Sequence, residues 1–326
     1  MAVPAETVQT FAMVGIREDL SDVISNIAPT ETPFYSMCKK GTAKNRSPEW
    51  QTDTLADADA TNAAIEGDDV AADAVVATVR LKNYTQIMDK TVSVSTTGQA
   101  VDTAGRANEL KYQVAKAGQE LKRDIEARAV GNYASLAGDA STASTMAGAE
   151  AWIATNQGTI ESGGVVGGWE ETSTGIVDAQ TNATATVDAT EAQLKDVIRL
   201  CWAEGGDPTV ILCNGEIKQA YSEFTGIATQ YRDNPGRSTA KASILAAADV
   251  YISDFGTHSI MPDRFMSTRS ALVLDPKLWE LKFLQPFKTV PLAKTGHNDK
   301  RLMSVELTLC SKNELGNGKV VDINAA

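Results

Sequence analysis

The residues that most often carry out chemistry are sparse in this chain and form no recognised catalytic motif. The two histidines, His258 and His297, lie in neither a zinc-protease nor a serine-hydrolase pattern. Asp263 and Asp275 stand near predicted strand ends, where an ordinary turn residue is the stronger interpretation. An enzyme needs several converging groups with shifted pKa values, and no such set is indicated. The sequence therefore favours a protein that is not an enzyme.

Metal and cofactor sites are not indicated either. The segment GGVVGG at residues 163–168 lacks the Lys-Ser/Thr ending of a phosphate-binding loop. The cysteines form no Cys-x-x-Cys pair, so we expect buried free thiols rather than a zinc site. They are Cys38, Cys201, Cys213 and Cys310. We expect no cofactor.

Length, hydropathy and charge narrow the class further. The chain has 326 residues, 43% of them apolar, which is enough for a buried core and two or three subdomains. The net charge of −12 argues against a protein that binds nucleic acid through contacts to its phosphates, although the protein could still enclose nucleic acid. No stretch approaches the roughly 20 apolar residues that cross a bilayer, and the N-terminus carries no secretory pattern. We expect a protein made in a cytoplasm, with no membrane partner.

The clearest element that could position other residues is a helix predicted over residues 102–131. Its start can be capped by Asp102 or Thr103, and Gly131 can end it. About 30 residues would give a helix of about 45 Å. One apolar face is formed by Leu110, Val114, Ala117, Leu121 and Ile125.

Charged residues on this helix are predicted to face outward. Lys122 with Glu126, and Asp124 with Arg128, are opposite charges four residues apart. Together with Glu120, these carboxylates are interpreted as a solvated or interfacial face rather than as catalytic groups.

The first 50 residues are typical of an arm that docks on other chains. A short amphipathic stretch ends near Ile27, and Pro29 and Pro33 then favour extended geometry before Phe34. A basic stretch follows, consisting of Lys39, Lys40, Lys44 and Arg46.

A long hairpin is predicted to follow the arm. One strand begins near Trp50, and the returning strand is rich in β-branched residues between residues 75 and 84. The loop between them is either a solvated linker or an acidic tip that binds basic groups of another subunit. Its acidic residues are Asp57, Asp59, Glu66, Asp68, Asp69 and Asp73.

The rest of the chain divides into three segments of different composition and pattern. Residues 136–187 are rich in Gly, Ala, Ser and Thr and are predicted to form an irregular insertion with Trp152 and Trp169 as anchors. Residues 188–275 alternate helix and strand patterns, in which Thr190 can cap one helix and Asn214 starts another. Residues 276–326 are mostly strand. A long helix between an early hairpin and late antiparallel strands predicts the α+β class.

The order of these segments resembles that of major capsid proteins of tailed bacteriophages with the HK97-like fold. VGIREDLSDVISNIAPTETPF at residues 14–34 and TAGRANELKYQVAKAGQELKRDIE at residues 103–126 are similar to segments of the SU10-type subgroup. The resemblance implies six parts. They are an N-terminal arm (1–47), an extended loop or β-hairpin (48–92), a spine helix with part of the peripheral domain (93–135), the insertion (136–187), an axial domain (188–275) and the C-terminal strands of the peripheral domain (276–326).

The resemblance also implies a function. Pentamers and hexamers of the chain would form an icosahedral head shell around double-stranded DNA, in a virion assembled in the bacterial cytoplasm. The expected partners are further copies of the chain, a scaffolding protein, a portal protein and a cement protein. Because the helix begins near residue 102, no room is expected for an N-terminal scaffolding domain. Because no lysine lies between Lys44 and Lys82, the loop cannot supply the lysine of a covalent Lys–Asn link between subunits.

Contacts between subunits are predicted at the arm and the loop. The acidic loop is expected to meet the basic stretch of a neighbour, with Phe34 and Trp50 among the contacts and Arg232 and Arg237 as further basic candidates. An encapsulin-like nanocompartment, another phage structural protein such as a tail component, and, least favoured, a cytoplasmic enzyme are the alternatives.

Overall fold

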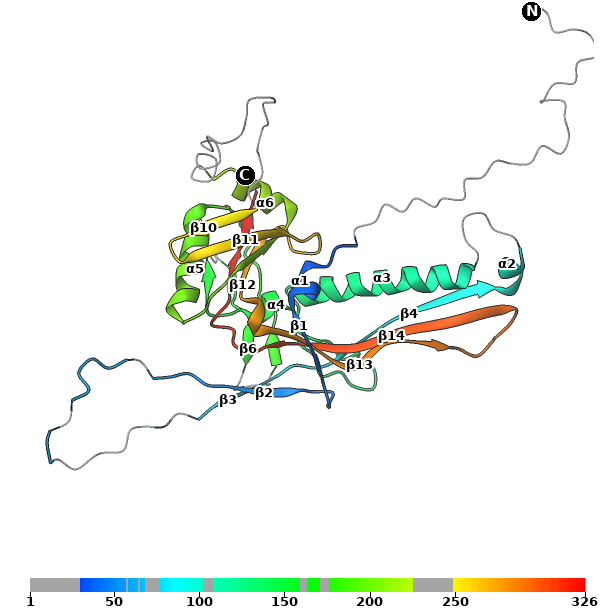
Figure 1. The fold of residues 1–326 in the computed structure, drawn as a ribbon, viewed down its shortest axis with the longest axis horizontal. Coiled ribbons are helices and arrows are strands. Elements are labelled where there is room, and N and C mark those ends of the chain that lie inside the picture. Colours follow the sequence, from blue (N-terminus) through cyan, green and yellow to red (C-terminus); the bar gives the residue numbers. More distant parts are fainter. Residues whose placement is uncertain are drawn as a thin grey trace, which may run out of the picture.

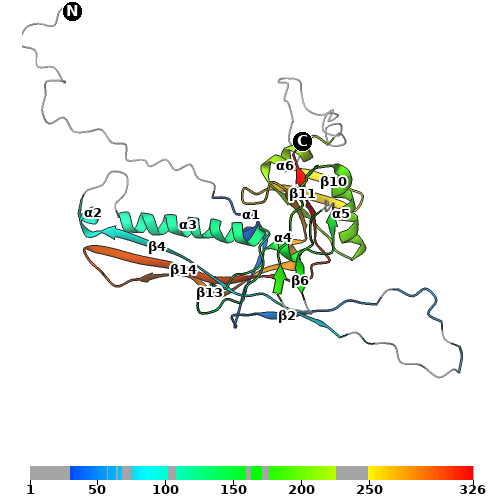
Figure 2. The same ribbon diagram turned by 180° about the vertical axis from the view of Figure 1, so that it is seen from behind.

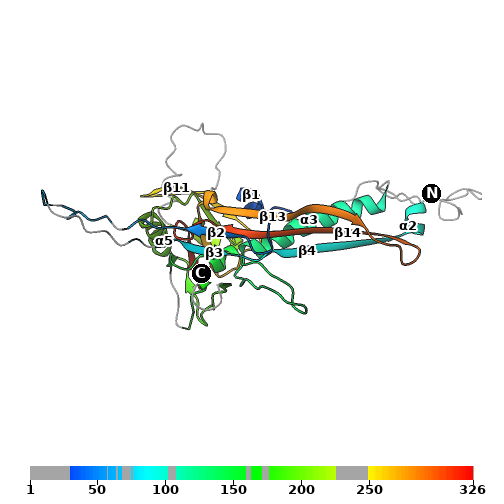
Figure 3. The same ribbon diagram turned by 90° about the horizontal axis from the view of Figure 1, so that it is seen from below.

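A computed structural model describes residues 30–56, 58–63, 65–67, 75, 77–101, 108–158, 163–170, 176–224 and 249–325. An elongated part, in which one long helix lies along long strands, joins a more rounded part built on a second sheet (Figures 1 and 2). A hairpin loop projects from the body in the direction opposite to helix α2, Thr96–Ala100 (Figures 1 and 3). This mixture of helices and separate sheets is the predicted α+β class.

The elongated part rests on a four-stranded sheet of order β1-β13-β14-β4. Strands β13 and β14 form a long antiparallel hairpin, in which Leu281 lies opposite Leu309. Strand β4 pairs antiparallel with β14, and β1 pairs parallel with β13. The strands are β1 Lys39–Thr42, β4 Gln86–Ser95, β13 Trp279–Pro291 and β14 Asn298–Ser311.

The long helix α3, Glu109–Val130, covers one face of this sheet (Figure 2). Asn108 caps its start by accepting the N–H of Lys111 at 2.9 Å, and Gly131 follows its last residue. Its 22 residues correspond to about 33 Å, shorter than predicted. The predicted apolar face is confirmed where Leu121 and Ile125 are fully buried. The predicted caps Asp102 and Thr103 lie outside the described residues.

The predicted charge pairs on this helix are wrong. Asp124 pairs with Lys90 of strand β4 at 2.8 Å, while Arg128 donates to the carbonyls of Met146 and Ala134. Glu126 does not face solvent, because its side chain is fully buried. The i,i+4 spacing allowed these pairs, but the sheet and the segment after the helix offered closer partners.

The rounded part contains a mixed six-stranded sheet of order β10-β11-β9-β12-β15-β5. Strands β9 and β12, at its centre, are buried throughout. The strands are β5 Gln157–Gly158, β9 Val210–Cys213, β10 Val250–Ser253, β11 Gly256–Pro262, β12 Ser270–Leu274 and β15 Gly318–Val321. Strands β5 and β15 come from the predicted insertion and from the C-terminal segment, so the sheet draws on three of the segments distinguished in the sequence.

Helices α5, Glu191–Ala203, and α6, Gly215–Ser222, belong to this rounded part. The predicted cap of α5 is confirmed, since Thr190 and Gln193 form a reciprocal capping box. Asn214 caps α6 by accepting the N–H of Glu216. Both helices pack their apolar sides on a second core, separate from the core beneath α3.

The insertion is irregular and is anchored by the aromatic packing of Trp152 and Trp169, as predicted. The fully buried ring of Trp152 lies between Trp50, with ring centroids 5.5 Å apart, and Trp169, at 6.2 Å and nearly parallel. The remaining short elements here and elsewhere are α4 Ala149–Trp152, β6 Gly168–Glu170, β7 Ile176–Asp178, β8 Val187–Asp188, the 3-10 turn Pro276–Leu278 and β16 Ile323–Asn324.

The described residues hold no cluster of three or more metal-ligating side chains and no helix long and apolar enough to cross a membrane. The four cysteines are free and buried, as expected. Burial raises the pKa of the Cys201, Cys213 and Cys310 thiols to about 12.

Candidate interaction surfaces

The last residues of the predicted arm are docked on their own chain. Helix α1, Pro33–Met37, packs on the C-terminal part of α3 (Figures 1 and 2). The ring of Phe34 is fully buried and meets Trp279 edge-on, with centroids 5.8 Å apart. The prediction that Phe34 contacts a neighbouring subunit therefore needs correction, because its side chain has no surface left for a neighbour.

Helix α1 is capped from a distant part of the chain. Thr32, at its N-cap position, makes no side-chain cap, and Pro33 has no N–H to satisfy. The carboxyl of Glu126 accepts the next two donors, the N–H groups of Phe34 and Tyr35, each at 2.7 Å. Burial and, secondly, the carboxyl of Asp263 raise the pKa of Glu126 to about 8, against the opposing effect of these two donors.

The basic stretch divides between internal and exposed groups. Lys40 lies over the ring of Tyr35 and donates to the carbonyl of the same residue. The guanidinium of Arg46 donates to the carbonyl of Ala137. Lys39 and Lys44 are exposed, with no ion-pair partner among the described residues. These two lysines are the members of the stretch whose charge remains available to another subunit.

Trp50 is also used within its own chain. It lies in strand β2, Glu49–Thr52, which pairs antiparallel with β3, Val79–Lys82. Its indole N–H donates to the carbonyl of Ser311 at 2.7 Å, and its ring packs against Trp152. The hairpin is thus confirmed, although its paired strands are shorter than expected, and Trp50 fastens its base to the body.

The loop between β2 and β3 projects away from both cores (Figures 1 and 3). Asp59 and Glu66 are exposed on it, and Asp59 accepts the N–H and the hydroxyl of Thr61 at 2.7 and 2.6 Å. These hydrogen bonds lower the pKa of Asp59, so the loop carries an ionised carboxylate. The other predicted contacts lie outside the described residues. They are Asp57, Asp68, Asp69, Asp73, Arg232 and Arg237.

The same loop carries large apolar side chains that we did not single out as contacts from the sequence. Leu55 is 99% exposed, Ile65 is 76% exposed and Val75 is 95% exposed. A signal was present, because these are bulky residues in a segment otherwise dominated by Ala and Asp. The loop thus combines negative charge with apolar groups that its own chain leaves uncovered.

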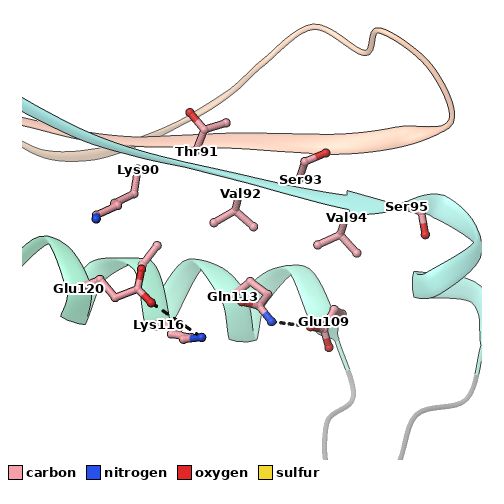
Figure 4. A pocket seen from close by; sticks show the side chains of 11 residues that line it. Lys90, Thr91, Val92, Ser93, Val94, Ser95, Glu109, Gln113, Lys116 and Glu120 are labelled. Atoms are coloured by element: carbon pink, nitrogen blue, oxygen red, sulfur yellow. Dashed lines mark hydrogen bonds and ion pairs between the residues drawn. The ribbon is translucent and has the colours of Figure 1, made fainter. Parts of the chain in front are cut away.

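A groove of about 480 Å³ runs between strand β4 and helix α3. Val92 and Val94 of the strand face the helix, where Gln113 donates to Glu109 and Lys116 pairs with Glu120 (Figure 4). The lining contains no histidine or cysteine. Its open form and mixed polar and apolar lining differ from the enclosed, mostly apolar pockets that bind small molecules.

One serine–histidine contact was not predicted. The hydroxyl of Ser253 lies 2.7 Å from Nε2 of His258, and Nδ1 of that buried ring lies 2.8 Å from the carbonyl of Pro208. The carbonyl requires a proton on Nδ1, and burial lowers the pKa of His258, so in the neutral ring Nε2 accepts the hydroxyl of Ser253. Ser253 also accepts the N–H of Phe255, which closes the turn between β10 and β11. We therefore assign the contact a structural role. It stabilises the β10–β11 hairpin, and the buried imidazole of His258 is not accessible to bulk solvent.

Comparison with protein families gives one match over almost the whole chain. Residues 5–324 match the model of the family described as SU10 major capsid protein. A major capsid protein of Escherichia phage Phieco32 is 26% identical over 332 residues, which cover 93% of each chain.

Comparison with solved structures identifies the fold. The cyanophage A-1(L) capsid asymmetric unit gives a TM-score of 0.64 at 12% identity, over 97% of this chain and 98% of that one. The SrpI encapsulin of Synechococcus elongatus PCC 7942 gives a TM-score of 0.54 at 9% identity, over 93% and 94%. At these identities the similarity concerns the HK97-like fold alone.

Proposed function

This chain belongs to the SU10 major capsid protein family, and from that premise we propose that its copies assemble as pentamers and hexamers into an icosahedral phage head shell. It is a phage major capsid protein, and its role in the virion is structural. The shell encloses double-stranded DNA without sequence-specific contacts, and the net charge of −12 suits a wall to which DNA does not adhere.

The observation that carries the proposal is the projecting loop. It places Leu55, Ile65 and Val75 away from both cores, between 76% and 99% exposed. Apolar side chains of this size are stabilised when another surface removes them from water. We assign that surface to an adjacent copy, on which the carboxylates of Asp59 and Glu66 meet exposed cations such as Lys39 and Lys44.

Other components complete the particle in this proposal. A separate scaffolding protein guides assembly in the host cytoplasm, a portal protein admits the DNA, and a cement protein can strengthen the shell. The chain itself performs no catalytic step.

Negative-stain electron microscopy of the purified protein tests the proposal. Closed angular shells or rings of five and six subunits are expected, either from the chain alone or after co-expression with the scaffolding protein of the same phage. Discrete small oligomers under both conditions would contradict it. Shells that carry an enzyme cargo instead of DNA in the native particle would support the encapsulin-like alternative.

Salt is expected to weaken the contacts between subunits. Raising the ionic strength from 0.1 to 1 M shortens the Debye length from about 10 to about 3 Å. Because each exposed ion pair contributes only about 0–1 kcal/mol, the concentration needed for assembly should rise several-fold rather than by orders of magnitude. Light scattering against protein concentration measures this threshold. A threshold that is indifferent to salt would remove the charge pairing from the proposal.

Mature particles are expected to dissociate into intact monomers on a denaturing gel. The loop has no lysine between Lys44 and Lys82, so it offers no amine for a covalent bond to a neighbour's asparagine. Non-covalent contacts therefore hold the shell. A ladder of crosslinked species after boiling in detergent would contradict this.

A further inference from the structure

Two buried carboxyl groups meet where helix α1, helix α3 and the segment after strand β11 come together. Glu126 is 0% exposed and Asp263 is 1% exposed, and their side chains are within hydrogen-bonding reach of each other. Oδ1 of Asp263 accepts the N–H of Phe265 at 2.9 Å. Its Oδ2 is buried and finds no other donor among the described residues, so a proton carried by Glu126 is its available partner.

The pair does more than fill the core. Both oxygens of Glu126 hold the first free N–H groups of α1, whose own N-cap residue makes no side-chain cap. The main-chain N–H of Asp263 is fixed to the carbonyl of Cys213 in the six-stranded sheet at 2.8 Å. The carboxyl pair thus joins the arm to the long helix and to the central strands of the rounded part.

Two neighbouring buried carboxyl groups cannot both be ionised without a large cost in free energy. The Glu126–Asp263 pair therefore retains one proton between its members. The other groups facing Glu126 are few. Lys40 of strand β1 favours the ionised form, whereas the buried thiol of Cys38 and the phenol of Tyr35 carry no charge at neutral pH. One lysine, itself held by main-chain carbonyls, does not neutralise two buried carboxylates.

We propose that the Glu126–Asp263 pair is a proton-operated latch that holds helix α1 on the end of α3 while it shares a proton and releases α1 when the proton is lost. On release the proton passes to solvent, both carboxylates become hydrated, and the arm residues around Phe34 are freed to move. The latch does not depend on the identity of the assembled particle. It would let a change of pH alter how firmly the arm is bound to its own subunit.

The direction of the pH dependence follows from linkage. The docked pair holds a proton up to the pKa of about 8, whereas a released glutamate loses it above its ordinary value of 4.5. Docking therefore takes up one proton between these values, and its stabilising effect is complete below about pH 4.5 and lost as pH rises through 8. The equilibrium constant for release should increase about tenfold per pH unit between about pH 5 and 7 and level off above about 8.

Amide hydrogen exchange of the full-length chain tests the latch directly. Protection factors of the peptide that covers residues 32–38, corrected for the intrinsic pH dependence of exchange, report release of α1. In the wild-type protein they should fall about tenfold per pH unit over the range from about 5 to 7. A protection factor independent of pH across this range would overturn the proposal.

Two variants distinguish release of α1 through the Glu126–Asp263 pair from a general loss of stability. Asp263→Asn removes the like charge but leaves Glu126 buried, so the pKa of Glu126 should fall and the protection factors should level off at a lower pH than in the wild type. Glu126→Gln removes the titrating group itself, so the tenfold fall per pH unit should be largely lost, with lower protection overall because one N–H loses its acceptor. Persistence of the wild-type slope in both variants would contradict the assignment.

Glu120→Gln provides the matched control. It is the same class of change on the same helix, at a partly exposed residue paired with Lys116. The wild-type slope should be unchanged in this variant, and its loss would show that the pH dependence does not originate at the buried pair.

Discussion

Replacing Leu55, Ile65 and Val75 together by serine should abolish shell assembly while leaving the thermal unfolding of the isolated subunit unchanged. The three side chains are 99%, 76% and 95% exposed in the subunit, so the fold loses no buried contact. Burying each on a neighbour contributes about 1.5–3 kcal/mol. Since about 1.4 kcal/mol is a tenfold change in an equilibrium constant, the combined loss should raise the assembly threshold more than a thousandfold.

The threshold is measured by light scattering and the subunit by circular dichroism during heating. The matched control is a triple change to serine at Ala58, Ala60 and Ala63, which are exposed in the same loop and lose little apolar area. This control should assemble nearly as the wild type does. Shells of the first variant forming at the wild-type concentration would exclude the loop's apolar groups as a principal contact.

Replacing Phe34 by alanine should destabilise the subunit itself, by about 3–5 kcal/mol. The ring is fully buried against Trp279, whose indole N–H is held by Asn317 at 2.9 Å, so the surroundings have little freedom to fill the cavity. Denaturant unfolding of the unassembled protein measures the loss, and the fluorescence of Trp279 should change with it.

The same substitution at Phe255 is the control. Phe255 is 38% exposed and packs against Trp202 at the surface with the rings tilted by 35°, so alanine there should cost clearly less, about 1 kcal/mol. If Phe34→Ala unfolded like the wild type and failed only to assemble, the arm would be an inter-subunit element, as the sequence predicted, rather than part of this chain's core.

Local patterns predicted the elements that depend on nearby residues. Apolar spacing identified helix α3, because a 3.6-residue period needs no information from the rest of the chain. The caps Thr190 and Asn214 were recognised for the same reason, since a capping side chain bonds two or three residues ahead. The hairpin base at Trp50 followed from a strand pattern that begins there and from a returning run rich in β-branched residues.

Contacts between distant segments were not predictable in this way. Strand β4 pairs with β14 more than 200 residues later, which no local pattern specifies. Lys39 and Lys40 belong to a strand whose backbone adds to β13, which no local pattern predicted, although the side chain of Lys39 stays exposed. The exposure of Leu55 likewise became visible only when the loop was placed outside both cores.

The sequence by itself determined the family, the α+β class and the presence of the hairpin and the long helix, because these rest on motif residues and on short-range periodicity. Only the tertiary structure decided the roles of Glu126 and Asp263. Each was noted in the sequence as an ordinary charged residue, one on a helix face and one in a turn. Their burial and shared proton arise because α1 returns to the end of α3 and β11 ends beside it, and that meeting depends on chain segments far apart in sequence.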